Sequence, residues 1–180
     1  MDIKAFIFDM DGLLFDSERI VQRSWEIAGD ELGIPHMGDV IYHTLGMNRA
    51  GRNEYFRKYI REDFPFEEFG KLTRDNFWKI VDKEGLPLKK GAKELLAYGK
   101  SQGYKMAVAT SSSREYAMGN LIRAGIDSYF DSVVCGDMVK KAKPDPEIYQ
   151  KASESLGIPP EYCMAFEDAP GGILSAHQAG

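Results

Sequence analysis

The chain has 180 residues, of which 43% are hydrophobic, 12% aromatic and 28% charged, and its formal net charge is -5. These values are typical of a globular protein with one domain or two small ones. The aromatic content excludes a disordered chain, and the presence of only 2 Cys excludes a disulfide-stapled secreted domain. Neither a membrane-spanning run nor a signal peptide stands out, so we expect a cytoplasmic protein. The acidic balance predicts no nucleic-acid partner and no membrane partner.

Four short apolar runs have the length and composition of buried strands. They are Ile3 to Phe8, Lys105 to Ala109, Ser132 to Cys135, and Cys163 to Phe166. Consecutive apolar positions suit a sheet that is covered on both faces, and amphipathic helical patterns separate the last three runs. Strands that alternate with helices predict a Rossmann-like parallel α/β sheet. We interpret Cys135 and Cys163, which lie inside two of the runs, as reduced core residues.

The interval from Ser17 to Gly85 breaks this alternation, because it contains helical patterns and no convincing strand. Apolar residues at helical spacing predict three helices in this interval, at Val21 to Leu32, Tyr55 to Tyr59, and Phe69 to Val81. We therefore predict an inserted α-helical domain at residues 17–85, and an α/β core formed by residues 1–16 and 86–180.

Polar side chains follow the predicted strands, at the sheet edge where open parallel sheets bind ligands. The candidates are Asp9 and Asp11 after the first run, Thr110 and Ser111 after the second, Lys143 in the loop after the third, and Glu167 and Asp168 after the fourth. Carboxylates, hydroxyl groups and an ammonium group together are the set that phosphoryl transfer through an aspartate nucleophile needs. Oxygen ligands favour Mg²⁺, and the three His residues lie outside this set.

The residue types also predict roles within such a reaction. A hard cation removes the repulsion between an attacking carboxylate and a phosphate dianion. A second carboxylate two residues further on can protonate the leaving oxygen and then take a proton from water. Thr110 and Ser111 can hold phosphoryl oxygens, and Lys143 can neutralise charge in the transition state.

The segments that carry these residues resemble the four motifs of the haloacid dehalogenase superfamily. The segment FIFDMDGLLFDS at residues 6–17 is similar to motif one, and Thr110 after MAVA is similar to motif two. Lys143 in KPDPEIY is similar to motif three, and the Glu167-Asp168 pair in FEDAPGGI is similar to the acidic motif four. The resemblance covers the chain from Ile3 to Gly180, with the helical cap inserted between motifs one and two.

This resemblance implies a fold, a cofactor and a set of roles. It implies Asp9 as the nucleophile, Asp11 as the general acid and base, and Mg²⁺ held by Asp9, the backbone carbonyl of Asp11, and Asp168, with Glu167 at or beside the metal. The position of the cap and the KPDP form are most similar to the β-phosphoglucomutase and sugar-phosphatase branch. That branch implies a small phosphorylated metabolite as the substrate.

Residues of the predicted cap bear on the substrate. Arg49, which follows Gly46 in LGMNRAG, lies where this branch often has a substrate-contacting Arg. Trp25 suits the core of the cap and also a substrate platform. In β-phosphoglucomutases a His precedes this Trp by four residues, whereas Val21 stands here, which weakens the mutase interpretation. The branch also normally continues past residue 180 into another strand and helix, so we expect a truncated core that lacks an edge strand.

We expect a Mg²⁺-dependent phosphatase of small phosphorylated metabolites, as a monomer or a weak oligomer. A β-phosphoglucomutase-type phosphomutase is the main alternative, because it would use the same aspartyl phosphate. A phospho-signalling module similar to receiver domains is a distant alternative. It is disfavoured because Asp9 follows the first strand and because receivers have no inserted cap.

Overall fold

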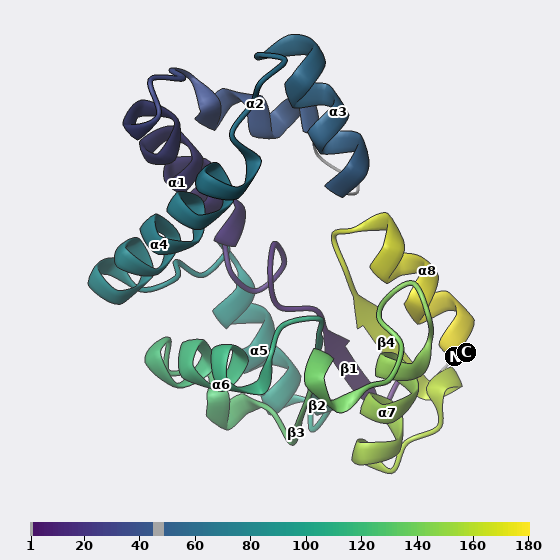
Figure 1. Ribbon diagram of the computed structural model, residues 1–180. Coiled ribbons are helices and arrows are strands. Elements are labelled where there is room, and N and C mark those ends of the chain that lie inside the picture. The colour runs from purple at the N-terminus through teal and green to yellow at the C-terminus, as the bar shows by residue number, and fades with distance from the viewer. Residues whose placement is uncertain (1, 45–48) are drawn as a thin grey trace. The chain divides into compact units, whose positions relative to one another are not determined.

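The computed structural model describes residues 2–44 and 49–180, without the side chains of residues 49 and 50 (Figure 1). The chain divides into two compact units, Met1–Asp16 together with Leu86–Gly180, and Ser17–Gly85. We name the first the α/β unit and the second the helical unit. Within the described ranges, no helix is both long enough and apolar enough to cross a membrane.

The α/β unit is built on a parallel four-stranded sheet in the order β3-β2-β1-β4, which confirms the predicted α/β fold. The strands are β1 (Ala5–Phe8), β2 (Lys105–Thr110), β3 (Ser132–Cys135) and β4 (Cys163–Phe166). In the register of the sheet, Phe8 lies beside Val108 of β2 and Phe166 of β4. The residues that follow β1 and β4 therefore lie at the same height along the strands, at one edge of the sheet.

Side chains alternate in direction along each strand, so the apolar strands present apolar side chains on both faces of the sheet. Helices cover both faces. The helices of this unit are α5 (Ala92–Ser101), α6 (Arg114–Arg123), α7 (Glu147–Leu156) and α8 (Pro170–Ala179), with 3-10 turns at Asp127–Tyr129, Gly136–Met138 and Pro160–Tyr162. Ile7 packs with Ile148 of α7 on one face. On the other face, Gly99 of α5 lies so close to Phe6 and Met106 that a Cβ would be 2.8 Å from the Met106 sulfur. Figure 1 shows α5 and α6 on one side of the strands and α7 and α8 on the other.

Strand β4 differs from the buried strand that its sequence predicts. Met164 is 44% exposed, and Ile173 and Leu174 of the following helix α8 are 54% and 44% exposed. Among the described strands, β4 pairs with β1 alone, so it forms an edge of the sheet. The prediction that Cys163 is a core residue is confirmed only in part, because its side chain packs against the core cluster around Ile7 but is only half-buried. Cys135 is buried as predicted, and both are free thiols.

The helical unit contains α1 (Ser17–Glu31), α2 (Met37–Thr44), α3 (Arg49–Tyr59) and α4 (Phe66–Glu84). Sequence periodicity predicts three of these helices and misses α2, because its 8 residues give too few turns for a clear pattern. The core of the unit is aromatic. The ring centroid of Trp25 lies 5.6 Å from those of Phe56 and Phe69, and both pairs are edge-to-face. Such pairs add directional contacts to the burial of apolar area.

Candidate active site

The ends of strands β1, β2 and β4 place three of the predicted site residues at one sheet edge. Asp9 follows β1, and its backbone N–H donates to the Phe166 carbonyl of β4 over 2.9 Å. This bond holds Asp9 beside the end of β4, where Glu167 follows. Thr110 is the last residue of β2. Asp9 and Thr110 are 8% and 1% exposed, so both polar side chains are buried at the end of an apolar strand.

Lys143 joins two of the buried carboxylates. Its Nζ lies 2.6 Å from Asp9 Oδ1 and also contacts Glu167 Oε1. The hydroxyl group of Tyr149, on α7, donates to the same Glu167 oxygen over 2.9 Å. The sequence analysis did not identify Tyr149 as a site residue. Two carboxylates share one ammonium group here. When both are ionised the cluster carries excess negative charge, which favours the binding of a further cation.

The environment of Asp9 opposes its negative charge. Burial raises the pKa of Asp9 to about 7, even though the adjacent Lys143 acts in the opposite direction, and the nearby Glu167 raises it further. Burial is also the main cause that raises the pKa of Tyr149, followed by the charge of Glu167. Tyr149 therefore stays protonated and acts as a donor. A cation next to Asp9 would favour the ionised carboxylate, which is the nucleophilic form.

Three carboxylates form an acidic group that fits a metal ion. Ligand atoms of Asp9, Glu167 and Asp168 all lie within 4.8 Å of one another. Two glycines leave the space that these carboxylates occupy. A Cβ on Gly12, whose φ is +84°, would overlap the Asp168 carboxylate, and a Cβ on Gly172 would overlap that of Glu167. The donors are hard oxygen atoms, so the site fits Mg²⁺ better than it fits a softer metal.

Asp11 is held by two hydroxyl groups from the β2–α6 region. Ser112 Oγ donates to Asp11 Oδ2 over 2.7 Å, and the Tyr116 hydroxyl donates to Oδ1 over 3.1 Å. The sequence analysis did not assign a role to either residue. The available signal was position, because Ser112 lies two residues after the end of β2 and Tyr116 lies in the first turn of α6. Burial and the charge of Asp11 raise the pKa of Tyr116, so Tyr116 remains a donor.

The remaining predicted residues are distributed as follows. Ser111 is exposed and, within the described residues, its side chain makes no hydrogen bond to the cluster. Instead Thr110 Oγ1 accepts from the backbone N–H of Ser112 over 3.1 Å. In the helical unit Trp25 is 5% exposed. Gly46 lies outside the described residues, and Arg49 begins α3 with its side chain outside them.

Comparisons with known proteins agree with this arrangement. The sequence model of the haloacid dehalogenase-like hydrolases matches residues 3–180. The phosphorylated carbohydrates phosphatase of Thermotoga maritima is 34% identical over 178 residues, which are 99% of this chain and 82% of that protein. The putative phosphatase YhcW of Bacillus subtilis is 34% identical over 182 residues, covering 99% of this chain and 80% of its own. The crystal structure of a putative beta-phosphoglucomutase from Thermotoga maritima has a TM-score of 0.81 and 32% identity, and the match covers 99% of this chain and 82% of that one.

The family match extends over nearly the whole chain, and the relatives are similar over most of their own length. The parallel sheet and its covering helices are shared with the solved relative at a TM-score of 0.81. The chain therefore belongs to the haloacid dehalogenase-like hydrolase family, and it is an enzyme of the branch that contains phosphatases and β-phosphoglucomutase-like proteins.

Proposed function

We propose that this enzyme is a Mg²⁺-dependent phosphatase of small phosphorylated metabolites, principally sugar phosphates, and that Asp9 is its nucleophile. The observation that carries the proposal is the buried group formed by Asp9, Lys143 and Glu167, with Asp168 within ligand distance. The similarity to a phosphatase of phosphorylated carbohydrates supports the choice of substrate class.

The proposed reaction has two displacement steps. The Asp9 carboxylate attacks phosphorus, which forms an acyl phosphate and breaks the bond to the alcohol oxygen. Asp11 gives its proton to that oxygen, then takes a proton from the water that attacks the acyl phosphate, so phosphate leaves and Asp9 is regenerated. Lys143 and Thr110 stabilise the charge of the phosphoryl oxygens.

The acidic group would hold the metal in this reaction. We assign Asp9, the backbone carbonyl of Asp11, and Asp168 as ligands, with Glu167 at or beside the ion and paired to Lys143. Mg²⁺ bound there supplies the positive charge that lets a phosphate dianion approach a carboxylate. We also propose that the helical unit is an inserted cap that selects the substrate and limits the access of water.

Phosphate release from a panel of sugar phosphates, measured with Mg²⁺ and with a chelator, tests the proposal. We expect Mg²⁺-dependent turnover, and a loss of at least about a thousandfold in kcat for Asp9→Asn, because the nucleophile is removed. Asp30→Asn is the matched control, since Asp30 is an exposed carboxylate on α1. Retained turnover in Asp9→Asn, or equal turnover without a divalent cation, would contradict the proposal.

A phosphomutase is the second candidate, and it is favoured by the similarity to a structure named a putative beta-phosphoglucomutase. Such an enzyme would pass the phosphoryl group from Asp9 back to a sugar hydroxyl instead of to water. Val21 replaces the His that β-phosphoglucomutases have at this position, which disfavours it. Isomerised hexose phosphate that accumulates faster than free phosphate would reverse this ranking.

A further inference from the structure

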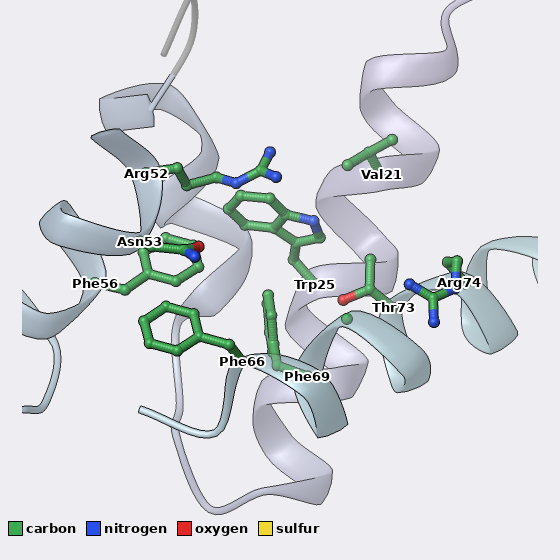
Figure 2. A pocket seen from close by; sticks show the side chains of 10 residues that line it. Val21, Trp25, Arg52, Asn53, Phe56, Phe66, Phe69, Thr73 and Arg74 are labelled. Carbon is green, nitrogen blue, oxygen red and sulfur yellow. The ribbon is translucent and has the colours of Figure 1, made fainter. Parts of the chain in front are cut away.

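Three charged side chains are buried together in the α/β unit. Those of Lys143, Asp9 and Glu167 are 10%, 11% and 4% exposed. The pocket of the helical unit, about 370 Å³ between α1, α3 and α4, differs in kind, because none of the described residues that line it is a carboxylate (Figure 2). The proposed chemistry thus depends on how the α/β unit holds the three buried side chains.

Tyr149 contacts two members of this cluster. Its hydroxyl group donates to Glu167 Oε1 over 2.9 Å, and it accepts from Lys143 Nζ over 3.5 Å. The same ammonium group lies over the Tyr149 ring, 5.0 Å from the ring centroid. Lys143 Nζ also contacts Asp9 and Glu167. Tyr149 therefore touches both partners of the Lys143–Glu167 pair.

The hydroxyl group distinguishes Tyr149 from an ordinary core residue. Tyr149 is 2% exposed, and it packs in an apolar cluster with Ile7 and Ile148. A phenylalanine would fill the same space and would bury no hydroxyl group. Burial of a polar group is unfavourable unless the group is hydrogen-bonded. The bond to Glu167 offsets this cost, so the hydroxyl group is the part of Tyr149 that concerns the site.

The start of α7 holds Tyr149 in a fixed place relative to the loop that carries Lys143. Glu147, two residues before Tyr149, accepts from the backbone N–H groups of Lys140 and Lys141, each over 3.0 Å. The loop and the first turn of the helix are therefore joined directly. A group that positions another must itself be held by its surroundings, and Tyr149 meets this condition.

Glu167 has enough partners to keep its place without Tyr149. Its Oε2 accepts from the backbone N–H groups of Asp168 and Ala169, over 3.1 Å and 3.3 Å. Its Oε1 contacts Lys143 as well as Tyr149. Loss of the tyrosine hydroxyl would therefore change the charge that Glu167 presents more than it would change the position of Glu167.

We propose that Tyr149 is a positioning residue that limits how strongly Glu167 draws the Lys143 ammonium group away from Asp9. Its hydroxyl group donates to the oxygen that Lys143 also contacts, and a neutral donor there weakens the attraction of that oxygen for cations. Lys143 thus stays available to Asp9 and to the phosphoryl oxygens. The effect on turnover rests on the proposed function, whereas the effect on cation binding rests on these contacts alone.

Two binding measurements on Tyr149→Phe, which keeps the ring, test the proposal. Calorimetry should show Mg²⁺ binding about three- to tenfold more tightly than to the wild type, because Glu167 loses a donor that reduced its attraction for cations. Inorganic phosphate should bind the Mg²⁺-saturated variant about three- to tenfold more weakly, because Lys143 is drawn toward Glu167. General damage to the site would weaken both ligands. Changes in the same direction, or no change in either affinity, would overturn the proposal.

A control and a double variant locate the effect. Tyr104→Phe should leave both affinities unchanged, because Tyr104 precedes β2 at the end opposite the site, and its ring stacks on Phe6 with centroids 4.2 Å apart. If Tyr149 acts through Glu167, adding Tyr149→Phe to Glu167→Gln should not alter the affinity for Mg²⁺. An undiminished shift in the Glu167→Gln background would overturn the proposal.

Turnover separates this role from the proposed function. With saturating Mg²⁺, kcat for a sugar phosphate should fall about three- to tenfold in Tyr149→Phe and stay normal in Tyr104→Phe. An active enzyme whose two affinities change together would refute the role of Tyr149 alone. Opposite changes of the two affinities in a protein that releases no phosphate from sugar phosphates would refute the proposed function alone.

Discussion

The hydroxyl group of Tyr116 donates a hydrogen bond to Asp11 Oδ1 across 3.1 Å. With Ser112 on the other carboxylate oxygen, it fixes the plane of the Asp11 carboxyl group. A general acid works only from a defined orientation toward the leaving oxygen. Tyr116 is therefore a positioning residue for the proposed proton transfer.

Tyr116→Phe should reduce kcat/KM, which reports the steps up to departure of the alcohol, about tenfold for a sugar phosphate, whose alkoxide leaving group needs a proton. It should reduce kcat/KM less than about threefold for p-nitrophenyl phosphate, whose leaving group needs none. Steady-state kinetics with the two substrates measure the difference, and Tyr98→Phe, at an exposed tyrosine of α5, is the control. An equal loss on both substrates would mean that Tyr116 acts on folding or on phosphoryl binding instead.

Much of the α/β unit could be predicted because its signals are local. Apolar runs predicted the positions of β1 to β4, and parallel strands necessarily bring the residues after them to one edge. That geometry brings Asp9 and Glu167 to the same edge, and the pairing of β1 with β4 places them side by side. The exposure of β4 could not be predicted in this way, because an edge strand and an interior strand can have the same apolar composition. Only the order of the strands distinguishes them.

The hydroxyl contacts of the site could not be predicted from the pattern. Tyr149 occupies an apolar position of α7, and its aromatic ring fits the core whether or not its hydroxyl reaches a partner. That the hydroxyl reaches Glu167 depends on how α7 packs against the sheet. Similarly, Ser111 and Ser112 are equivalent in the sequence, and the direction of the chain after β2 gives the contact with Asp11 to Ser112.

Two neighbouring glycines of α8 offer a matched test of the acidic group. A Cβ on Gly172 would overlap the Glu167 carboxylate, whereas a Cβ on Gly171 would meet nothing within 4 Å. Gly172→Ala should displace Glu167 from Lys143 and reduce kcat/KM at least tenfold, with a loss of about 1–3 kcal/mol in the free energy of unfolding. Gly171→Ala should keep full activity. Similar behaviour of the two variants in activity and chemical-denaturation assays would contradict this account of Glu167.

Lys143 should contribute to catalysis through its charge. Lys143→Met keeps a long side chain and removes the ammonium group that lies 2.6 Å from Asp9. We expect kcat to fall by roughly 10²–10³, the usual effect of removing a stabiliser of transition-state charge. Lys141→Met is the control, because the Lys141 side chain is 74% exposed. Circular dichroism confirms folding, and a folded Lys143→Met protein with normal kcat would exclude this role.

The raised pKa of Asp9 predicts how the stability of the metal-free protein depends on pH. In the unfolded chain Asp9 has a pKa near 3.8, and in the folded protein its pKa is about 7. The folded state therefore binds more protons between these values, so ionisation of Asp9 destabilises the fold progressively as pH rises from about 4 to 7. Asp9→Asn removes this titration. In the presence of a chelator, the free energy of unfolding of the variant should therefore rise relative to that of the wild type as pH increases. The difference between the two proteins should be larger at pH 8 than at pH 4 by roughly 2–4 kcal/mol.

Urea denaturation of both proteins at several pH values, in the presence of a chelator, measures this difference. Asp30→Asn, at an exposed carboxylate, should show little pH-dependent difference from the wild type. Saturating Mg²⁺ should reduce the gap at pH 8, because the ion stabilises the ionised form of Asp9 in the wild type. A gap between Asp9→Asn and the wild type that is constant from pH 4 to pH 8 would show that Asp9 does not ionise at a raised pKa in the folded protein.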